Sequence, residues 1–239
     1  MVSSDIQNQL LRALPAQDLN YLASHLEHVT LEASQSLEKA LRPAEHAYFP
    51  ETALASLVTN SGKLYLEAGM FGNDGMSGTA LLMGDQSPFD CRVRIAGTGY
   101  RVAAGPFQEF LRTHPYSERL LRRYAQAEHI QIVHTTLSTG QTKLEHRVAR
   151  WLLMVRDRVS HDVLNITQEE ISVSLGVRRP GVTDCLHKLE GLHFLKCGRK
   201  QIQIIDRRAL AAFAGAPYGD PEREYARLMG FPPGVYTPL

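Results

Sequence analysis

The segment 166–195, ITQEEISVSLGVRRPGVTDCLHKLEGLHFL, has the pattern of two short helices joined by a tight turn. Thr167 and Glu170 have the spacing of a capping box at the start of the first helix. Gly176 follows that helix, where a turn between helices can use a positive φ. Pro180 falls in the first turn of the second helix, where a missing backbone N–H costs little. The segment therefore predicts a helix-turn-helix.

Apolar or small side chains occupy the places where the two helices would cross. They are Ile171, Ser172, Leu175, Val177, Val182 and Cys185. If Val182, Leu186 and Leu189 face the core, the opposite face of the second helix is polar and mostly basic. The alternative is a helical hairpin that only packs against its neighbours.

The basic face of the second helix predicts DNA contacts. We expect base contacts from its N-terminal end, at Arg178, Arg179, Gly181, Thr183 and Asp184. Arg178 and Arg179 are the leading candidates, because arginine bonds both acceptors of guanine in the major groove, a contact worth about 1–3 kcal/mol of discrimination.

A basic turn, Cys197–Lys200, lies between two short strand patterns, Phe194–Lys196 and Gln201–Ile205, and predicts a wing. Phosphate contacts give affinity without sequence information. We predict them at Thr167, Gln168, His187, Lys188, Lys196, Arg199 and Lys200.

Charge is distributed unevenly along a chain whose formal net charge is only +1. Residues 1–110 hold 7 basic and 12 acidic side chains, whereas residues 141–212 hold 13 basic and 8 acidic ones. A local basic excess can attract a polyanion because electrostatic attraction acts over a Debye length of roughly 10 Å. A solvated basic face is the alternative explanation.

The segments before the helix-turn-helix have three different textures. Leucines at three- and four-residue steps predict helix over 5–30, around Pro15. Short apolar runs broken by glycine then predict a small antiparallel sandwich or barrel. These runs are Ala47–Phe49, Leu54–Val58, Lys63–Glu67, Ala80–Met83, Cys91–Ile95 and Tyr100–Ala103.

A long amphipathic helix is predicted from Tyr116 to Leu137, where the chain has no proline or glycine, and we expect Thr139-Gly140 to end it. Its apolar stripe would pack on the same chain or on the same helix of a second subunit. The dimer is favoured, with contacts from Leu120, Tyr124, Ala127, Ile130, His134 and Leu137. The next helix, Lys143 to Val159, carries Trp151, which we expect in the core.

From about Leu144 to Leu210 the chain resembles the C-terminal domain of the Crp/Fnr transcription regulators, in HRVARWLL, ITQEEI, LGVRR, LHKLEGLHFL and the wing. The preceding order of segments is also similar. The resemblance implies an α+β protein with an N-terminal antiparallel β-roll (double-stranded β-helix), a long dimerisation helix and a C-terminal winged helix-turn-helix. It further implies a homodimer on a palindromic site of double-stranded DNA, with half-sites about one helical turn apart, and RNA polymerase as a further partner.

Two departures from the family pattern bear on recognition. The places of a base-contacting glutamate and of a second arginine hold Pro180 and Asp184, so only Arg179 of that trio is kept and a different operator is expected. In the sensor, Gln86-Ser87-Pro88 stands where a cyclic-nucleotide domain has its phosphate-binding arginine. A buried phosphate would lack its partner, so cyclic AMP is not expected to bind. Another effector, still unknown, would meet Gly72, Asn73, Asp74, Ser77 and Ser87, unless these are ordinary turn residues.

Cofactor chemistry has little support in the sequence. Cys91, Cys185 and Cys197 are too few and too scattered for a disulfide framework, and no cysteine cluster precedes them for an iron–sulfur centre. No histidine pair suggests haem. The alternative function, a cupin-like β-roll enzyme or small-molecule or metal-binding protein, needs clustered histidines, yet His46 stands alone between His28 and His114. We therefore expect no catalysis, no metal and no cofactor.

The sequence suggests four segments. They are a sensor at 1–110, a dimerisation helix at 111–140, the DNA-binding domain at 141–212 and a Pro/Gly-rich tail at 213–239. The tail, with one helix at Glu222–Met229, would be flexible or packed on the body. The N-terminus has no basic start with an apolar core, and no window reaches about 18 apolar residues, so we expect no membrane segment and a cytoplasmic protein.

Overall fold

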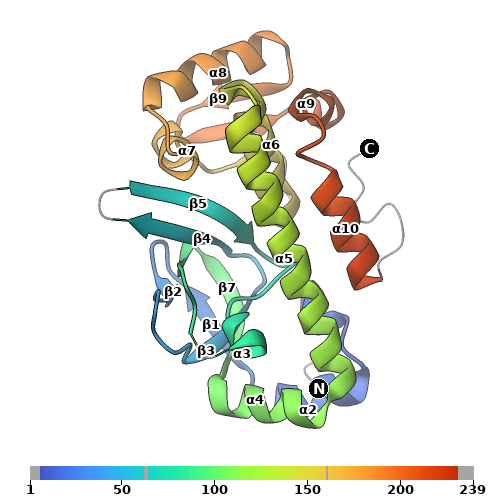
Figure 1. The fold of residues 1–239 in the computed structure, drawn as a ribbon. Helices are drawn as coiled ribbons and strands as arrows, with labels where there is room; N and C mark the ends of the chain where they lie inside the picture. Colours follow the sequence, from blue (N-terminus) through green and yellow to red (C-terminus); the bar gives the residue numbers. More distant parts are fainter. Residues whose placement is uncertain (1–5, 62–63, 85, 160, 231–239) are drawn as a thin grey trace. The chain divides into compact units, whose positions relative to one another are not determined.

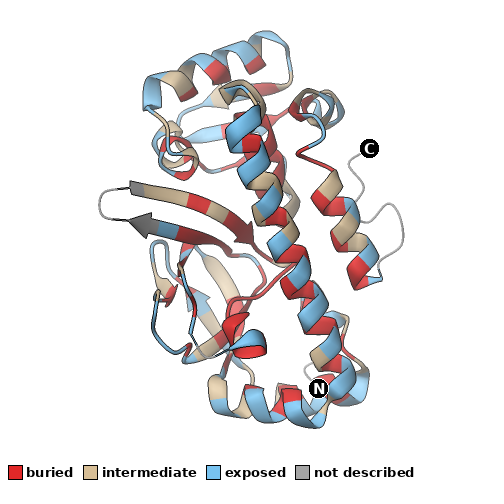
Figure 2. Ribbon diagram, viewed as in Figure 1, coloured by how far each residue is buried: buried red, intermediate tan, exposed pale blue. Residues whose placement is uncertain are grey.

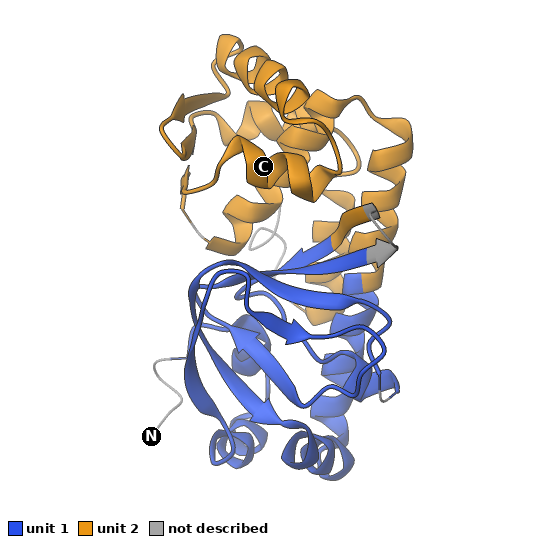
Figure 3. Ribbon diagram, turned by 90° about the vertical axis from the view of Figure 1, so that its left-hand side faces the viewer, with its two compact units in different colours: residues 1–59, 69–128 blue, residues 60–68, 129–239 orange. Residues whose placement is uncertain are grey.

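The structure, a computed structural model, describes most of the chain: residues 6–61, 64–84, 86–159 and 161–230. It divides into two compact units (Figure 3), unit 1 being Met1–Thr59 with Gly69–Glu128, and unit 2 Asn60–Ala68 with His129–Leu239. The division falls inside one β-hairpin and inside the long helix. The four segments predicted from the sequence therefore do not coincide with the two compact units, and their division by function stays a prediction.

Unit 1 begins with two short helices, α1 (Gln9–Arg12) and α2 (Ala16–Ala23). The side chain of Asn8 caps α1 by accepting from the backbone N–H of Leu10 and Leu11. The prediction of helix up to residue 30 is wrong, because β1 (Glu27–Leu31) is a strand paired antiparallel with β7 (Gly97–Ala103). The β-branched pair Val29-Thr30 favours this extended pairing over a further helical turn.

Two antiparallel sheets form the predicted β-roll (Figure 1), with strand orders β1-β7-β3 and β2-β6-β4-β5. The remaining strands are β2 (Ser36–Glu38), β3 (His46–Pro50), β4 (Leu54–Ser61), β5 (Leu64–Phe71) and β6 (Asp90–Ile95). One predicted strand is wrong: Ala80–Met83 is a helical turn, α3. Alanine, leucine and methionine are good helix formers, and this run has no β-branched residue.

Close packing of the roll requires glycine at Gly99. A Cβ there would lie 2.7 Å from the carbonyl oxygen of Phe49 on the neighbouring strand β3. Phe49 is fully buried, and its ring meets that of Phe107 edge-on at 6.1 Å. Phe107 and Phe110 come from α4 (Ala104–Thr113), so this helix closes the core of unit 1.

The long helix α5 (Pro115–Gln141) is confirmed, and it passes from unit 1 into unit 2 at residue 128. Gly140 does not end it, because the N–H of Thr142 still bonds the carbonyl of Ser138 at 3.0 Å. Buried and exposed positions alternate along α5 (Figure 2), as expected for an amphipathic helix.

Unit 2 holds the C-terminal helices and a small sheet of order β8-β10-β9. Its helices are α6 (Leu144–Val159), α7 (Gln168–Leu175), α8 (Arg179–Gly191), α9 (Arg207–Ala214) and α10 (Asp220–Met229). Its strands are β8 (Val163–Leu164), β9 (Leu195–Gly198) and β10 (Gln201–Ile204). The predicted winged helix-turn-helix is confirmed, with α7 and α8 as its helices and β9 and β10 as its wing.

Trp151 lies in the core of unit 2, as predicted, and its indole N–H donates to Oε1 of Glu67 at 2.7 Å. Within the described part of the chain, no helix combines the length and the apolar character that crossing a membrane requires.

Candidate nucleic-acid interface

Helix α7 begins and ends as its sequence predicts. The Thr167 hydroxyl accepts from the N–H of Glu170, and the Glu170 carboxylate accepts from the N–H of Thr167 at 2.6 Å. Gly176 ends the helix at φ +63°. Arg147 of α6 donates to the carbonyl of Leu175 at 2.7 Å, which secures the last turn of α7. The turn between the two helices is therefore held by both local and tertiary hydrogen bonds.

Helix α8 has its apolar face inward. Val182, Leu186 and Leu189 are fully buried, and the helix packs against α6 and α7. Arg178 is the N-cap and Pro180 stands in the first turn, so this end of α8 has fewer backbone N–H groups to satisfy. Arg178 and Arg179 are exposed at this end, where their side chains can face a ligand.

The predicted base-contacting residues lie together on the outer part of α8. Arg178, Arg179 and Asp184 are exposed, whereas Gly181 and Thr183 are half-buried. A Cβ at Gly181 would meet Leu144 at 3.1 Å, so this backbone is turned partly toward α6. The Thr183 hydroxyl donates to Oε1 of Gln168 at 2.7 Å, which links α8 to the first residue of α7.

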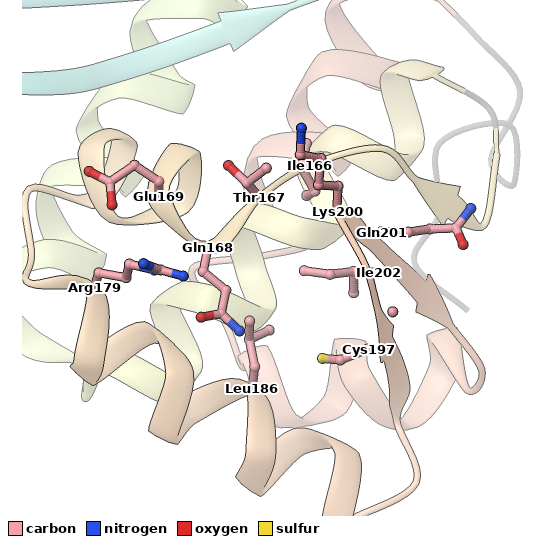
Figure 4. A pocket seen from close by; sticks show the side chains of 11 residues that line it. Ile166, Thr167, Gln168, Glu169, Arg179, Leu186, Cys197, Lys200, Gln201 and Ile202 are labelled. Carbon is pink, nitrogen blue, oxygen red and sulfur yellow. The ribbon is translucent and has the colours of Figure 1, made fainter.

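A cleft of about 440 Å³ lies between the helix-turn-helix and the wing (Figure 4). It is lined by the start of α7, one side of α8 and the two wing strands. The lining residues are Ile166, Thr167, Gln168, Glu169, Arg179, Leu186, Cys197, Gly198, Lys200, Gln201 and Ile202. Arg179 and Lys200 supply two cations against the one carboxylate of Glu169, and the N-terminus of α7 adds a partial positive charge. The cleft therefore suits an anionic ligand.

The predicted phosphate contacts fall into three groups. Thr167, Gln168 and Lys200 line the cleft, and Lys196, Arg199 and His187 are exposed outside its lining. Lys188 is already engaged, because its ammonium group lies 2.9 Å from Oε1 of Glu145. This hydrogen bond lowers the pKa of the Glu145 carboxyl. DNA would therefore have to compete with Glu145 for Lys188.

Among the polar and ionisable side chains that line the cleft, sequence reasoning missed three: Glu169, Cys197 and Gln201. Gln201 pairs with Gly198 at the start of β10, and only the wing geometry places it next to α7. Burial raises the pKa of the Cys197 thiol to about 11, with Glu190 adding to the effect. Cys197 is therefore a neutral thiol at physiological pH, as expected for an inert wing residue.

The residues predicted for an effector pocket make hydrogen bonds with other parts of the same chain. The Asp74 carboxylate accepts from the N–H of Gly72 at 2.8 Å, and the carbonyl of Asn73 accepts from the N–H of Gln9. The Ser77 hydroxyl accepts from the N–H of Tyr48. Ser87 lies in a separate loop, where its hydroxyl donates to the carbonyl of Phe89 at 2.7 Å. The contacts of Asp74 and Ser87 are local to their turns, whereas those of Asn73 and Ser77 join segments remote in sequence.

The predicted dimer contacts on helix α5 fall into two sets, one buried and one partly exposed. Leu120, Tyr124 and Ala127 are buried within the same chain, and Tyr124 donates to the carbonyl of Met76 at 3.2 Å. Because these three side chains fill the core of their own chain, they offer little surface to a second subunit. Ile130 and His134 are half-buried, and Leu137 is 48% exposed. These three remain available, with Val133, which is 51% exposed, beside them.

A buried carboxyl, Glu128, lies on α5 where unit 1 ends. Its oxygens accept from the hydroxyls of Thr79 at 3.1 Å and Tyr124 at 3.3 Å. Burial, with the nearby Glu38 and Asp74 carboxyls, raises its pKa to about 8. In the described ranges, no three His, Cys, Asp or Glu side chains are grouped to hold a metal ion.

Comparison with known proteins agrees with this geometry. Residues 146–213 match the model of the Crp-like helix-turn-helix domain. The fold is similar to that of FixK2 from Bradyrhizobium japonicum, at 17% identity and a TM-score of 0.70, covering 80% of this chain and 98% of that one. A Crp/Fnr-family transcriptional regulator from Thermus thermophilus is 19% identical, with a TM-score of 0.63, over 80% of this chain and 100% of that one.

A third similar structure is the c-di-GMP-responsive global regulator CLP of Xanthomonas campestris. It is 15% identical, with a TM-score of 0.63, and the match covers 80% of this chain and 99% of that one. No curated protein matches the chain.

Proposed function

We propose that this chain is a transcription regulator of the Crp/Fnr type that binds a palindromic operator in double-stranded DNA as a homodimer. It has the fold of such regulators, and its helix-turn-helix domain matches the Crp-like model. The observation that carries this proposal is the cleft between α8 and the wing, where Arg179 and Lys200 face the same ligand space. The fold supports DNA as the class of partner, and Arg179 and Lys200 are the residues that we expect to contact it.

Base contacts are assigned to the N-terminal end of α8. Arg178 and Arg179 extend from the start of the helix, which in this class of domain lies in the major groove. Each arginine would bond O6 and N7 of one guanine, with Thr183 and Asp184 next to them along the helix. Because Pro180 has no N–H and no side-chain acceptor, a cytosine or adenine amino group has no partner at that position.

Phosphate contacts are assigned to the cleft and the wing tip. The N-terminus of α7 and Lys200 would hold one phosphate group of the backbone, and Arg199 and Lys196 would approach the neighbouring ones. These contacts orient the domain on the duplex for every sequence alike.

The dimer is assigned to the second half of α5. Ile130, Val133 and Leu137 place partly exposed apolar side chains there at three- and four-residue steps. An isologous contact between two copies would bury them, and a two-fold axis of the protein matches a palindrome in DNA. RNA polymerase is the further partner that transcription regulation requires, and the cytoplasm is the compartment in which we place the protein.

Cyclic AMP is not the expected effector. The loops that would receive it hold Gln86-Ser87-Pro88 in place of an arginine, and Asp74 is turned toward the backbone N–H of Gly72. A phosphate there would face a carboxylate without a guanidinium.

The test is a selection of bound sequences from random duplexes by the protein alone, with cyclic AMP, and with cyclic di-GMP. We expect a palindrome in the absence of any nucleotide. Enrichment only with a nucleotide would overturn the effector assignment, and no enrichment in any of the three would overturn the proposed function.

A further inference from the structure

Arg150 of α6 is a buried residue that joins three elements of unit 2. Its guanidinium donates from Nε to the carbonyl of Pro217 at 2.8 Å and from Nη1 to Oγ1 of Thr135 at 3.2 Å. Thr135 belongs to the second half of α5, and Pro217 lies between α9 and α10. The side chain is only 5% exposed, so water competes little for these hydrogen bonds.

A second junction lies further along α6. The Tyr218 hydroxyl donates to Oδ2 of Asp157 at 2.7 Å and accepts from Nη2 of Arg207 at 2.8 Å. Arg207 also pairs with Asp157 at 2.9 Å. Tyr218 is 4% exposed. One phenol therefore connects the segment after α9 to both α6 and α9.

The charge of Arg150 restricts the geometry of the first junction. Burial lowers the pKa of Arg150 to about 10, and the neighbouring Glu222 carboxylate opposes this shift. Arg150 thus stays charged at neutral pH inside the protein, and the buried carboxyl of Glu222 on α10, whose own pKa burial raises, lies near it. A buried charge of this kind tolerates few alternative arrangements, because each displacement leaves it without its partners.

The segment that makes these contacts follows the matched domain, which ends at residue 213. It includes α10, whose Tyr225, Leu228 and Met229 are buried. At its start, the carbonyl of Phe213 lies 2.6 Å from Nδ1 of His146, and the two rings stack at 4.5 Å. Over residues 214–230 the predicted tail is therefore packed on unit 2 and is not a flexible extension.

We propose that residues 214–230 form a strap that fixes the DNA-binding domain against the second half of α5, with Arg150 and Tyr218 as its positioning residues. This inference rests on the proposed function. In a dimer, α5 would carry the contact between subunits and α8 the contact with DNA, and α6 packs on α8. The junction at Arg150 thus lies between the dimer axis and the recognition helix, and it sets the half-site spacing that the dimer accepts.

The spacing of half-sites is a sensitive measure of this junction. Each base pair added between half-sites moves one of them by about 3.4 Å and turns it by roughly 35° around the duplex axis. A rigid junction rejects such a change, whereas a loose one accommodates it. Overall affinity for DNA does not distinguish these cases, but the ratio of affinities between spacings does.

The experiment compares the palindrome selected by the full-length protein with versions one base pair shorter and one longer. The variants are Tyr218→Phe, which removes only the bridging hydroxyl, and Arg150→Lys, which keeps the charge but loses the guanidinium fork. Arg227→Ala is the matched control, because its ion pair with Glu224 lies on the exposed face of α10. Folding of each is checked by circular dichroism.

We expect the unmodified protein and Arg227→Ala to prefer one spacing, and Tyr218→Phe and Arg150→Lys to lose about tenfold of that preference. An unchanged spacing preference in a folded Tyr218→Phe protein would overturn the strap, and so would an equal loss of affinity at all three spacings. If Arg150→Lys does not fold, Tyr218→Phe decides.

Hydrogen exchange of the full-length chain provides a readout that does not depend on DNA. Arg150→Lys is expected to increase exchange both in α10 and in residues 129–141 of α5. Faster exchange in α10 alone would show that the strap does not reach α5 and would overturn the inference. If the unmodified protein selects no DNA sequence, the proposed function fails, and this exchange result still decides whether the strap exists.

Discussion

Arg179 and Lys200 line the same cleft, although one begins the recognition helix and the other lies in the turn of the wing. Both are exposed cations, and neither has an ion-pair partner among the salt bridges of the described residues. We propose different tasks for them: Arg179 would contact a base and Lys200 would contact a phosphate. Alanine at each position therefore separates sequence recognition from general affinity for DNA.

Replacing Arg179 with alanine should weaken binding to the selected operator by about 1–3 kcal/mol and relax the preference at one base pair in each half-site. The loss arises because a bidentate contact to guanine disappears. Fluorescence anisotropy with the operator and with its single-base variants measures both effects, with Arg227→Ala as the control. An unchanged base preference would show that α8 is docked differently.

Lys200→Ala should weaken binding to all duplexes alike and lower the slope of log affinity against log salt by about one. One fewer counterion is released when one phosphate contact is lost. The measurement is a salt titration on the operator and on an unrelated duplex. A loss confined to the operator would contradict the phosphate assignment.

Gly176→Ala should destabilise the protein by about 1–2 kcal/mol, because a left-handed residue with a Cβ is strained. The φ of Gly176 is +63°, and the added Cβ would also meet Cδ1 of Leu66 at 3.1 Å. Gly191→Ala is the matched control, since nothing lies within 4 Å of its Cβ position at the end of α8. Urea denaturation compares the two, and equal stabilities would argue against the strained turn.

Stability should fall as pH rises through the neutral range because of Glu128. Its folded-state pKa is about 8, above its ordinary value of 4.5, so the folded protein favours the neutral acid. The contribution is complete below about pH 4.5 and is lost as pH rises toward 8, with a slope of at most about 1.4 kcal/mol per pH unit.

Glu128→Gln tests this pH dependence, because it stays neutral and should show a smaller loss of unfolding free energy between about pH 5 and about pH 9. Urea denaturation of both proteins at the two pH values gives the difference. Glu38 and Cys91 also have raised pKa values through burial, and the charge of Glu128 adds to the shift at Cys91, so the variant loses that part as well. Parallel pH profiles would show that Glu128 is charged in the folded protein.

Much of the fold follows from local sequence patterns. The capping box at Thr167, the turn at Gly176 and the buried face of α8 depend on spacings of only a few residues, and all three are present. The strand β1 and the helix α3 were predicted wrongly, because leucine periodicity and a short apolar run do not separate helix from strand. The strand β1 forms because it pairs with β7, and β7 is remote from it in the sequence.

The candidate site was predicted where it depends on one helix face and missed where it depends on tertiary contacts. Gln201 reaches the cleft only because the wing folds back, and Lys188 is engaged by Glu145 from a different helix. The sequence also could not predict that Tyr124 is buried within its own chain, because an amphipathic stripe does not identify its partner. The strap depends on Arg150, whose role rests on Thr135 and Pro217 together.

The most direct test of the central claim is a double-mutant cycle between Arg179 and the N7 atom of guanine in the selected operator. 7-Deazaguanine is placed at each guanine in turn, symmetrically in both half-sites, and affinity is measured for the unmodified protein and for Arg179→Ala. The account predicts one position where deazaguanine weakens the unmodified protein by about 1–3 kcal/mol and leaves Arg179→Ala unaffected. Equal effects on both proteins at every guanine would contradict recognition of DNA through Arg179.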